Sequence, residues 1–182
     1  RRKKVDISVE NIKLIKNESL KIRRLIVDMI YRAGSGHPGG SLSAVEILTC
    51  IYFLFMKIKP DQPDWSQRDR FILSKGHAAP LLYAVLAQRG FFRTEELKTF
   101  NQPGTRFQKH VDMNVVPGAE VSTGSLGQGL SIGVGIKKKK KIDKKDYKVF
   151  VLMGDGEIQE GQVWEAAMTA AHYNLDNLIV FI

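Results

Sequence analysis

The sequence is short of cysteine and of long apolar runs, and each shortage excludes a class of protein. Cys50 is the only cysteine among 182 residues, so no disulfide forms within the chain, and we expect a cytoplasmic location. The longest apolar stretch covers residues 45–56 and is interrupted by Glu46 and Thr49, so it is too short to span a bilayer. The basic start, RRKKVDIS, leads into no apolar segment, so we expect neither export nor a membrane partner.

Basic residues outnumber acidic ones, but they are confined to two segments. The net charge is +9, of which residues 1–4 supply +4 and residues 136–148 supply +6, leaving −1 elsewhere. A nucleic-acid-binding face needs basic residues distributed over a surface. The sequence also lacks zinc-ligand spacing, a helix-turn-helix pattern and an RNA-binding aromatic signature. We interpret the segments as solvated and expect no nucleic-acid partner; a non-catalytic basic binding module stays as the alternative.

Periodic apolar residues predict several helices. Their spacing indicates a helix over residues 11–33, with Gly34 as its end. After the Gly/Pro-rich loop GSGHPGGS, the stretch SAVE (Ser43 to Glu46) is a capping-box pattern that opens a second helix. This helix runs to about residue 55. Further helices are expected from Pro80 to about residue 89 and from Thr94 onward.

Three short apolar runs predict buried strands at residues 70–74, 147–153 and 177–182. A helix over 161–173 separates the last two, and strand–helix–strand order requires a parallel pair. The expected class is α/β, a parallel β-sheet flanked by helices. We expect residues 1–9 to form a basic tail and 10–182 an incomplete domain, because the last strand has no following loop, where such sheets bind ligands.

Glycines interrupt one otherwise helical stretch, GSLGQGLSIGVGI. They stand at positions 127, 129, 133 and 135, and each costs about 1 kcal/mol relative to alanine inside a helix. Such a concentration indicates that backbone or ligand approaches too closely for a Cβ atom.

Asp155 lies between two glycines in VFVLMGDGEIQEG, directly after an expected strand. A carboxylate there can be a metal ligand, a turn-former or a helix cap. Gly154 and Gly156 would let the backbone turn sharply near a ligand, and magnesium binds diphosphates through carboxylate oxygens. An Asp-Gly turn explains the same letters. The nearby Glu157 and Glu160 can supply favourable charge in the first turn of a helix. Glu160 can instead belong to a subunit contact, and spacing alone does not choose between the two.

Three of the four histidines stand in loops next to glycine or proline. They are His37 in GSGHPGG, His77 in SKGHAAP and His110 in RFQKHVDMNVVPG. Imidazoles on such loops can reach a ligand and transfer protons near neutral pH, so we expect them to share a cavity, although each alone is typical of a surface turn. His172 lies on a predicted helix, and we expect a structural role for it. No nucleophile–histidine triad stands out.

Four stretches, taken together and in order, resemble the N-terminal, thiamine-diphosphate-binding domain of the transketolase family. They are AGSGHPGGSLSAVEIL, DRFILSKGHAAPLLYAVLAQRGFF, PGAEVSTGSLGQGLSIGVG and VLMGDGEIQEGQVWEAAMTAAHYNLDNLIVFI. The resemblance covers the chain from about residue 10 to its end. The segment STGSLGQG is similar to the corresponding sequence of the split form, in which the two halves are separate polypeptides.

The resemblance implies a cofactor site and a substrate site. It implies Mg2+ (or Ca2+ or Mn2+) bound by Asp155, and thiamine diphosphate held at Gly156 and His77. It places the thiamine rings beside Gly124, Ser125 and Leu126. It also implies that His37 and His110 bind the sugar and assist proton transfer, that His77 takes part in catalysis, and that Glu160 lies in a subunit interface.

The implied reaction moves a two-carbon ketol unit from a ketose phosphate to an aldose phosphate. The implied partners are a C-terminal half or subunit, together with further copies in a homodimer or heterotetramer. Dihydroxyacetone synthase and deoxyxylulose-phosphate synthase are the alternatives among related enzymes. Two departures stand out: His110 lies in KHVD, where the family has Gly and Pro around the histidine, and Lys137–Lys141 replace small and apolar residues. A second metal ligand, an asparagine, would follow Ile182.

Overall fold

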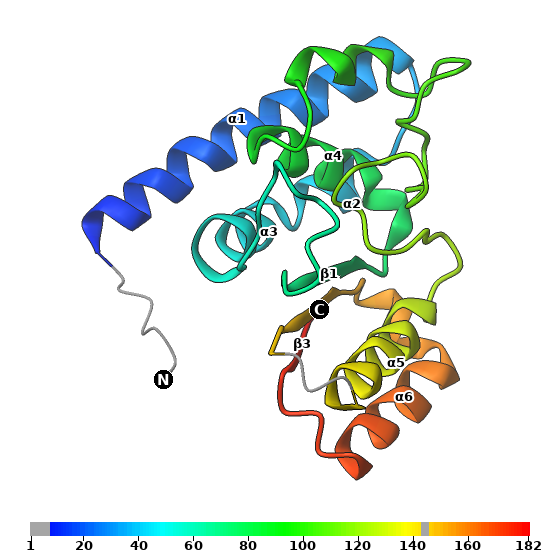
Figure 1. Ribbon diagram of the computed structural model, residues 1–182. Coiled ribbons are helices and arrows are strands. Elements are labelled where there is room, and N and C mark those ends of the chain that lie inside the picture. The colour runs from blue at the N-terminus through cyan, green and yellow to red at the C-terminus, as the bar shows by residue number, and fades with distance from the viewer. Residues whose placement is uncertain (1–7, 143–145) are drawn as a thin grey trace.

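The computed structural model describes residues 8–142 and 146–182. Within these residues a parallel sheet in the order β1-β2-β3 lies between two groups of helices, as Figure 1 shows. The strands are β1 (Arg70–Leu73), β2 (Val149–Leu152) and β3 (Leu178–Phe181). The predicted α/β class and the parallel βαβ unit are therefore confirmed.

Helices and tighter turns connect and cover the strands. The α-helices are α1 (Val9–Ala33), α2 (Pro38–Leu42), α3 (Val45–Cys50), α4 (Ala79–Gln88), α5 (Gln128–Ile142) and α6 (Gly161–His172); the π-helix is η1 (Ile51–Phe55), and the 3₁₀ turns are η2 (Gly76–Ala78), η3 (Thr94–Thr99) and η4 (Gly156–Gln159).

The long first helix ends before Gly34 as the sequence predicts, but it begins at Val9, two residues earlier than predicted. Ser8 caps it by accepting a hydrogen bond from the Asn11 N–H (3.2 Å), and Gly34 ends it with a φ of 59°. Positive φ suits glycine, which has no Cβ. Val9 of the expected tail thus belongs to the helix and Ser8 caps it, whereas residues 1–7 lie outside the described part of the chain.

The strands divide the core between their two faces. Leu73, Phe150 and Leu152 join the larger cluster beneath α1, α3 and α4. Ile72 and Val151, which face the other way, join a smaller cluster with α5 and α6. Successive side chains of a strand point to opposite faces, so the continuous apolar runs in the sequence correspond to a sheet covered on both sides.

The expected close approach at the α5 glycines is found at some positions and not at others. A Cβ on Gly129 would lie 2.8 Å from Ser74 Cα, and one on Gly133 would lie 3.0 Å from Val151 Cγ2. Gly127 has a φ of +83°, and a Cβ there would meet Glu160 Cβ at 2.9 Å. Gly135 has nothing within 4 Å. The glycines at 129 and 133 therefore serve packing of the helix on the sheet.

The second predicted helix departs from expectation at its start. Ala44, not Ser43, is the N-cap of α3, and no side chain caps it. Ser43 instead donates to the Gly40 carbonyl (3.2 Å), while Glu46 pairs with Arg23 (2.6 Å). The capping-box prediction was wrong because both of its side chains have partners elsewhere.

Two other local predictions also changed. The Gly/Pro-rich loop contains the five-residue α2, which Pro38 begins, since proline suits the first helical turn. The helix from Thr94 is a 3₁₀ turn, η3. Neither change moves the strands that position the site.

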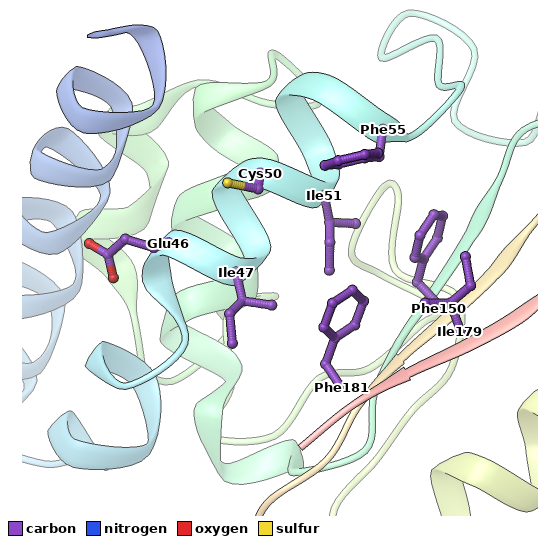
Figure 2. Close-up of a pocket in the computed structure, with 8 residues that line it drawn as sticks. All are labelled: Glu46, Ile47, Cys50, Ile51, Phe55, Phe150, Ile179 and Phe181. Carbon is purple, nitrogen blue, oxygen red and sulfur yellow. The ribbon is translucent and has the colours of Figure 1, made fainter. Parts of the chain in front are cut away.

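An apolar groove of about 450 Å³ lies between α3–η1 and the faces of β2 and β3. Figure 2 shows Phe150, Ile179 and Phe181 projecting from the strands toward Ile47 and Ile51. No helix in residues 8–142 and 146–182 has the length and hydropathy needed to cross a membrane.

Candidate active site

The candidate site lies at the carboxyl edge of the sheet, where β1 and β2 end side by side. The Ser74 N–H donates to the Leu152 carbonyl (2.8 Å), which joins the two strand ends. A cavity of about 430 Å³ opens there, walled by Gly39, Gly40 and Ser43, by Lys75 and His77, by Leu126, and by residues 154–157. Open α/β sheets bind ligands at this edge.

Asp155 lies in this cavity with an exposed carboxylate. It precedes η4 in right-handed helical backbone geometry (φ −60°), and its side chain does not cap that turn. Among the described residues, its carboxylate makes no hydrogen bond or ion pair. Of the three roles that the sequence left open, the helix cap is therefore absent, and the carboxylate oxygens face the cavity unengaged.

The glycines beside Asp155 provide space rather than unusual backbone angles. Neither Gly154 nor Gly156 is among the glycines with positive φ. A Cβ on Gly156 would meet nothing within 4 Å, and one on Gly154 would make only ordinary contact with Glu157 Cβ at 3.8 Å. The predicted sharp turn is thus not what requires glycine here; the absent Cβ leaves the backbone of residue 156 open to the cavity.

The structure brings His37, His77 and His110 together and leaves His172 apart. The His37 and His77 rings meet edge to face, with centroids 5.4 Å apart. His110 lies against Gly124, where a Cβ would be 3.4 Å from the imidazole Cδ2. His172 is at the end of α6 with its ring against Tyr173. A histidine near a helix C-terminus has a structural explanation.

His77 is tuned toward its neutral form. Burial lowers its pKa below the usual 6.5, and electrostatic interaction with His37, Lys75 and His110 lowers it further, while Glu157 opposes the change. Gly40 makes room for the ring, since a Cβ there would lie 2.8 Å from His77 Nε2. A neutral imidazole at pH 7 can accept a proton from a bound ligand.

The loop that carries His110 is fixed from its backbone. Tyr83 in α4 donates its hydroxyl to the Gln108 carbonyl (2.9 Å) and to the His110 carbonyl (3.2 Å). Tyr83 is itself fully buried. These two hydrogen bonds hold the backbone at His110 in a loop that lacks the glycine and proline of the family pattern.

The segment 124–126 borders the cavity to different extents. Leu126 is part of the wall, Gly124 touches His110, and the exposed Ser125 is not among the lining residues. The backbone before it is tightly packed, since a Cβ on Gly76 would lie 2.7 Å from the Thr123 carbonyl carbon.

Glu160 lies outside the cavity, at the start of α6. Its side chain is exposed and does not cap the helix. Its Cβ lies close to Gly127, so it is adjacent to the site without lining it.

Sequence reasoning missed Lys75, a buried lysine in the cavity wall. Its Nζ donates to Ser43 Oγ (3.1 Å). Burial lowers the pKa of Lys75, and the carboxylates of Asp155 and Glu157 partly oppose that effect. The letters SKGH gave a signal, because a polar residue directly after a buried strand lies at the ligand-binding edge.

Glu157 does lie in the first turn of a helix, the 3₁₀ turn η4, as the sequence predicts, but sequence reasoning missed its buried hydrogen bonds. Its side chain is buried and accepts hydrogen bonds from Ser74 Oγ, the Gly127 N–H (2.8 Å) and the Gly154 N–H (3.0 Å). Ser74 and Gly127 are distant from Glu157 in the sequence, so no local pattern predicts these hydrogen bonds.

The cavity fits one end of a metal–diphosphate group. Its donor set combines a free carboxylate at Asp155, a cation at Lys75 and open backbone at Gly156, which are groups that bind magnesium and phosphate oxygens. Within the described residues no cluster of three His, Cys, Asp or Glu side chains could hold a metal alone. Asp155 would thus be one ligand among several from other sources.

Comparison with known proteins identifies the family. The model of the family described as "Transketolase, thiamine diphosphate binding domain" matches residues 15–182. The chain belongs to the transketolase family. The resemblance predicted from its four stretches, to the N-terminal domain of a transketolase, is confirmed.

Two proteins of split transketolases and one solved structure illustrate the relationship. This transketolase domain is 47% identical over 167 residues to the 6-deoxy-6-sulfo-D-fructose transketolase subunit SqwG of Clostridium sp. (strain MSTE9), covering 92% of this chain and 61% of that protein. It is 46% identical over 176 residues to one subunit of the apulose-4-phosphate transketolase of Phocaeicola vulgatus, covering 97% and 61%. The transketolase from Leishmania mexicana superimposes with a TM-score of 0.86 at 35% identity, covering 91% of this chain and 26% of that one.

Proposed function

We propose that this chain is the diphosphate-binding part of a transketolase-type transferase. The reaction moves a two-carbon ketol unit from a ketose phosphate to an aldose phosphate, with Mg2+ and thiamine diphosphate as cofactors. When bound, thiamine diphosphate supplies the carbon nucleophile and the electron sink for this transfer. The chain's own residues bind and orient the reacting groups.

The observation that carries the proposal is the unengaged Asp155 carboxylate in the cavity at the carboxyl edge of the sheet. A carboxylate without a protein partner, beside open glycine backbone, is suited to a divalent cation that also binds phosphate oxygens. Lys75 adds positive charge to the same cavity, which neutralises part of a diphosphate. His77, neutral at pH 7, lines this cavity and also contacts His37.

His37 and His110 are the residues that we assign to the sugar. Neither lines the cavity that contains Asp155, whereas His77 lines it and meets the His37 ring. This arrangement supports a site in which the metal would lie near Asp155, the cofactor near His77 and the substrate near His37 and His110. The imidazoles can accept and donate hydrogen bonds to sugar hydroxyls and move protons between them. The two relatives named above act on sugars with a sulfonate or a phosphate group, so an anionic sugar is the substrate class that we expect.

The partner that we propose is a C-terminal transketolase half or subunit, in a homodimer or heterotetramer. This chain spans 61% of each of the two split relatives, and exposed Leu126 borders its site. Exposed Trp164 and Met168 on α6 add apolar surface outside the cavity. A partner seated against Leu126 would cover the rings of the cofactor and exclude water.

Asp155→Ala tests the proposal. In the assembly with its C-terminal partner, we expect magnesium-dependent affinity for thiamine diphosphate to fall by about tenfold or more, because one charged ligand contributes about 1.5–3 kcal/mol. The unfolding free energy should change by less than about 0.5 kcal/mol, because the side chain is exposed and unpaired. Calorimetric titration with and without Mg2+, alongside thermal unfolding, measures both.

Asp64→Ala is the matched control, since Asp64 is also an exposed aspartate and lies in the connection before β1, outside the residues that line the cavity. It should leave cofactor affinity unchanged. Equal affinity of the Asp155→Ala variant and the wild type, with Mg2+ present, would refute the metal assignment.

A further inference from the structure

Glu157 is a buried carboxylate beside an open cavity, with only 2% of its surface exposed. Its Oε1 accepts hydrogen bonds from Ser74 Oγ and the Gly127 N–H, and its Oε2 accepts one from the Gly154 N–H. Burying a carboxylate is costly unless such bonds offset the lost hydration. The chemistry proposed above leaves this group without a task.

The three donors belong to three segments that are distant in the sequence. Ser74 follows β1, Gly127 precedes α5, and Gly154 follows β2. Ser74 Oγ in turn accepts a hydrogen bond from the Gly129 N–H (3.1 Å) in the first turn of α5. One carboxylate thus connects two strand ends with the start of a helix, at the wall of the cavity.

Glu157 also closes the turn that holds Asp155. The Glu157 N–H donates to the Gly154 carbonyl (3.2 Å), while the Glu157 carboxylate accepts from the Gly154 N–H (3.0 Å). Residues 154 and 157 are therefore joined in both directions. The Asp155 side chain has no hydrogen bond of its own among the described residues, so the direction of its carboxylate depends on this backbone.

We propose that Glu157 is a positioning residue whose carboxylate presets the Asp155 carboxylate and the Gly156 backbone for the metal–diphosphate group. Groups fixed before binding lose less conformational entropy when the ligand arrives. Residues that orient a metal ligand without touching the metal can change affinity by about one to two decades. The inference deepens the proposed function and rests on it.

Asp69 offers a comparison at the opposite edge of the same sheet. It is 5% exposed and accepts hydrogen bonds from the Lys57 N–H (2.7 Å) and the Lys148 N–H (2.6 Å). It holds backbone segments together as Glu157 does, but it precedes β1 and is not among the residues that line the cavity. If burial and bonding alone mattered, the two carboxylates would be equivalent in their effect on ligand binding.

The experiment compares Glu157→Gln with Asp69→Asn. Each change keeps the shape of the side chain and replaces one acceptor oxygen with an NH2 donor. In Glu157→Gln, this NH2 group must face either the Gly154 N–H or the pair formed by the Gly127 N–H and Ser74 Oγ. At least one backbone amide at the cavity therefore loses its acceptor.

Two readouts are measured on each variant. Amide hydrogen exchange of the unliganded full chain, followed by NMR, reports the turn itself without any cofactor. Calorimetric titration of the assembly with Mg2+ and thiamine diphosphate reports affinity, and thermal unfolding reports stability. For Glu157→Gln we expect exchange to rise about tenfold or more at Gly127 or Gly154, whichever amide loses its acceptor, and affinity to fall by about tenfold or more.

For Asp69→Asn we expect faster exchange at Lys57 and Lys148 but affinity within about twofold of the wild type, whatever the loss of stability. Unchanged exchange at Gly127 and Gly154 in Glu157→Gln overturns the inference. So does a loss of affinity that both variants share in proportion to their loss of stability. If Glu157→Gln does not fold, Ser74→Ala replaces it: removal of one donor should weaken affinity about threefold or more, and unchanged affinity overturns the inference.

The two proposals fail in different ways. If the wild-type assembly does not bind thiamine diphosphate, the proposed function fails, and the positioning role toward that cofactor falls with it. If the wild type binds but Glu157→Gln binds equally well, only the positioning role is overturned.

Discussion

The surroundings of Lys75 determine its pKa and its hydrogen bonding. A buried lysine loses hydration, which lowers its pKa, and the structure places Asp155 and Glu157 where they partly offset that loss. The Ser43 hydroxyl accepts a hydrogen bond from one of its three N–H donors (3.1 Å). A cation held this way, in a cavity wall, is available to an anionic ligand.

Lys75→Met removes this charge while keeping most of the side-chain length. We expect affinity for thiamine diphosphate to fall by about tenfold or more, since a charge-assisted contact contributes about 1.5–3 kcal/mol. The loss of stability should be small, because the substitution also removes the cost of burying an ammonium group. Titration of the assembly and thermal unfolding measure the two quantities.

The outcome that contradicts this prediction is a large drop in melting temperature with unchanged affinity. Lys59→Met is a suitable control, because Lys59 lies on the surface with its Nζ 4.5 Å from the centre of the Trp65 ring, outside the residues that line the cavity.

At the scale of elements, contacts with the sheet determine which positions of α5 require glycine. It carries glycine where β1 and β2 are close and tolerates open surface elsewhere. Its lysine run, which the sequence left unexplained, is accommodated at its first two positions. Lys137 is buried with its Nζ 3.9 Å from Asp176 Oδ1, and Lys138 lies over the Tyr173 ring at 3.9 Å. The side chains of residues 139–141 lie outside the described part of the chain.

A matched pair of substitutions within α5 tests this account. Gly129→Ala forces a Cβ to within 2.8 Å of Ser74 Cα, and we expect it to destabilise the fold by about 1–3 kcal/mol. Gly135→Ala meets nothing within 4 Å, and we expect it to stabilise by about 0.5–1 kcal/mol through helix propensity. Denaturant unfolding measures both; equal effects of the two changes would show that packing on the sheet is not the reason for the glycines.

At the scale of the whole molecule, the sheet separates two cores and presents its carboxyl edge to the ligand. Charge is distributed differently: residues 1–4 and 136–148 together carry +10, and the remaining residues sum to −1. This distribution argues against a basic binding module, which needs basic residues spread over a surface.

A salt series distinguishes these two functions. With labelled single-stranded and duplex DNA, we expect dissociation constants weaker than about 10⁻⁴ M at physiological salt, because specific phosphate contacts are few. A variant lacking residues 1–4 should bind even less at low salt. Tight binding that falls steeply as salt rises, followed by fluorescence anisotropy, would support the basic module instead.

Much of the fold was predictable because its signals are local. Gly34 ends α1 as predicted, through backbone preference, and the three apolar runs identify the strands without reference to neighbours. The Ser8 cap, also a local feature, was not predicted. Where a prediction failed, as at Ser43 and Glu46, a partner distant in the sequence, such as Lys75 or Arg23, had taken the side chain.

The candidate site was predictable in part. Asp155 and the three loop histidines stand out by residue type and position, and the structure brings them to one edge of the sheet. Their roles stay predictions. Lys75 had a local signal, its place directly after a buried strand, but the burial of Lys75 and of Glu157 was not predictable, because it depends on residues distant in the sequence.

The sequence by itself determined the class of fold, the order of strands and helices, and the family, since periodicity, turn residues and motifs act over a few neighbouring positions. Only the tertiary structure decided which polar groups meet. Ser74, Gly127, Gly154 and Glu157 converge because parallel strands end at a common edge. The hydrogen bonds that satisfy one buried carboxylate there come from residues up to 83 positions away.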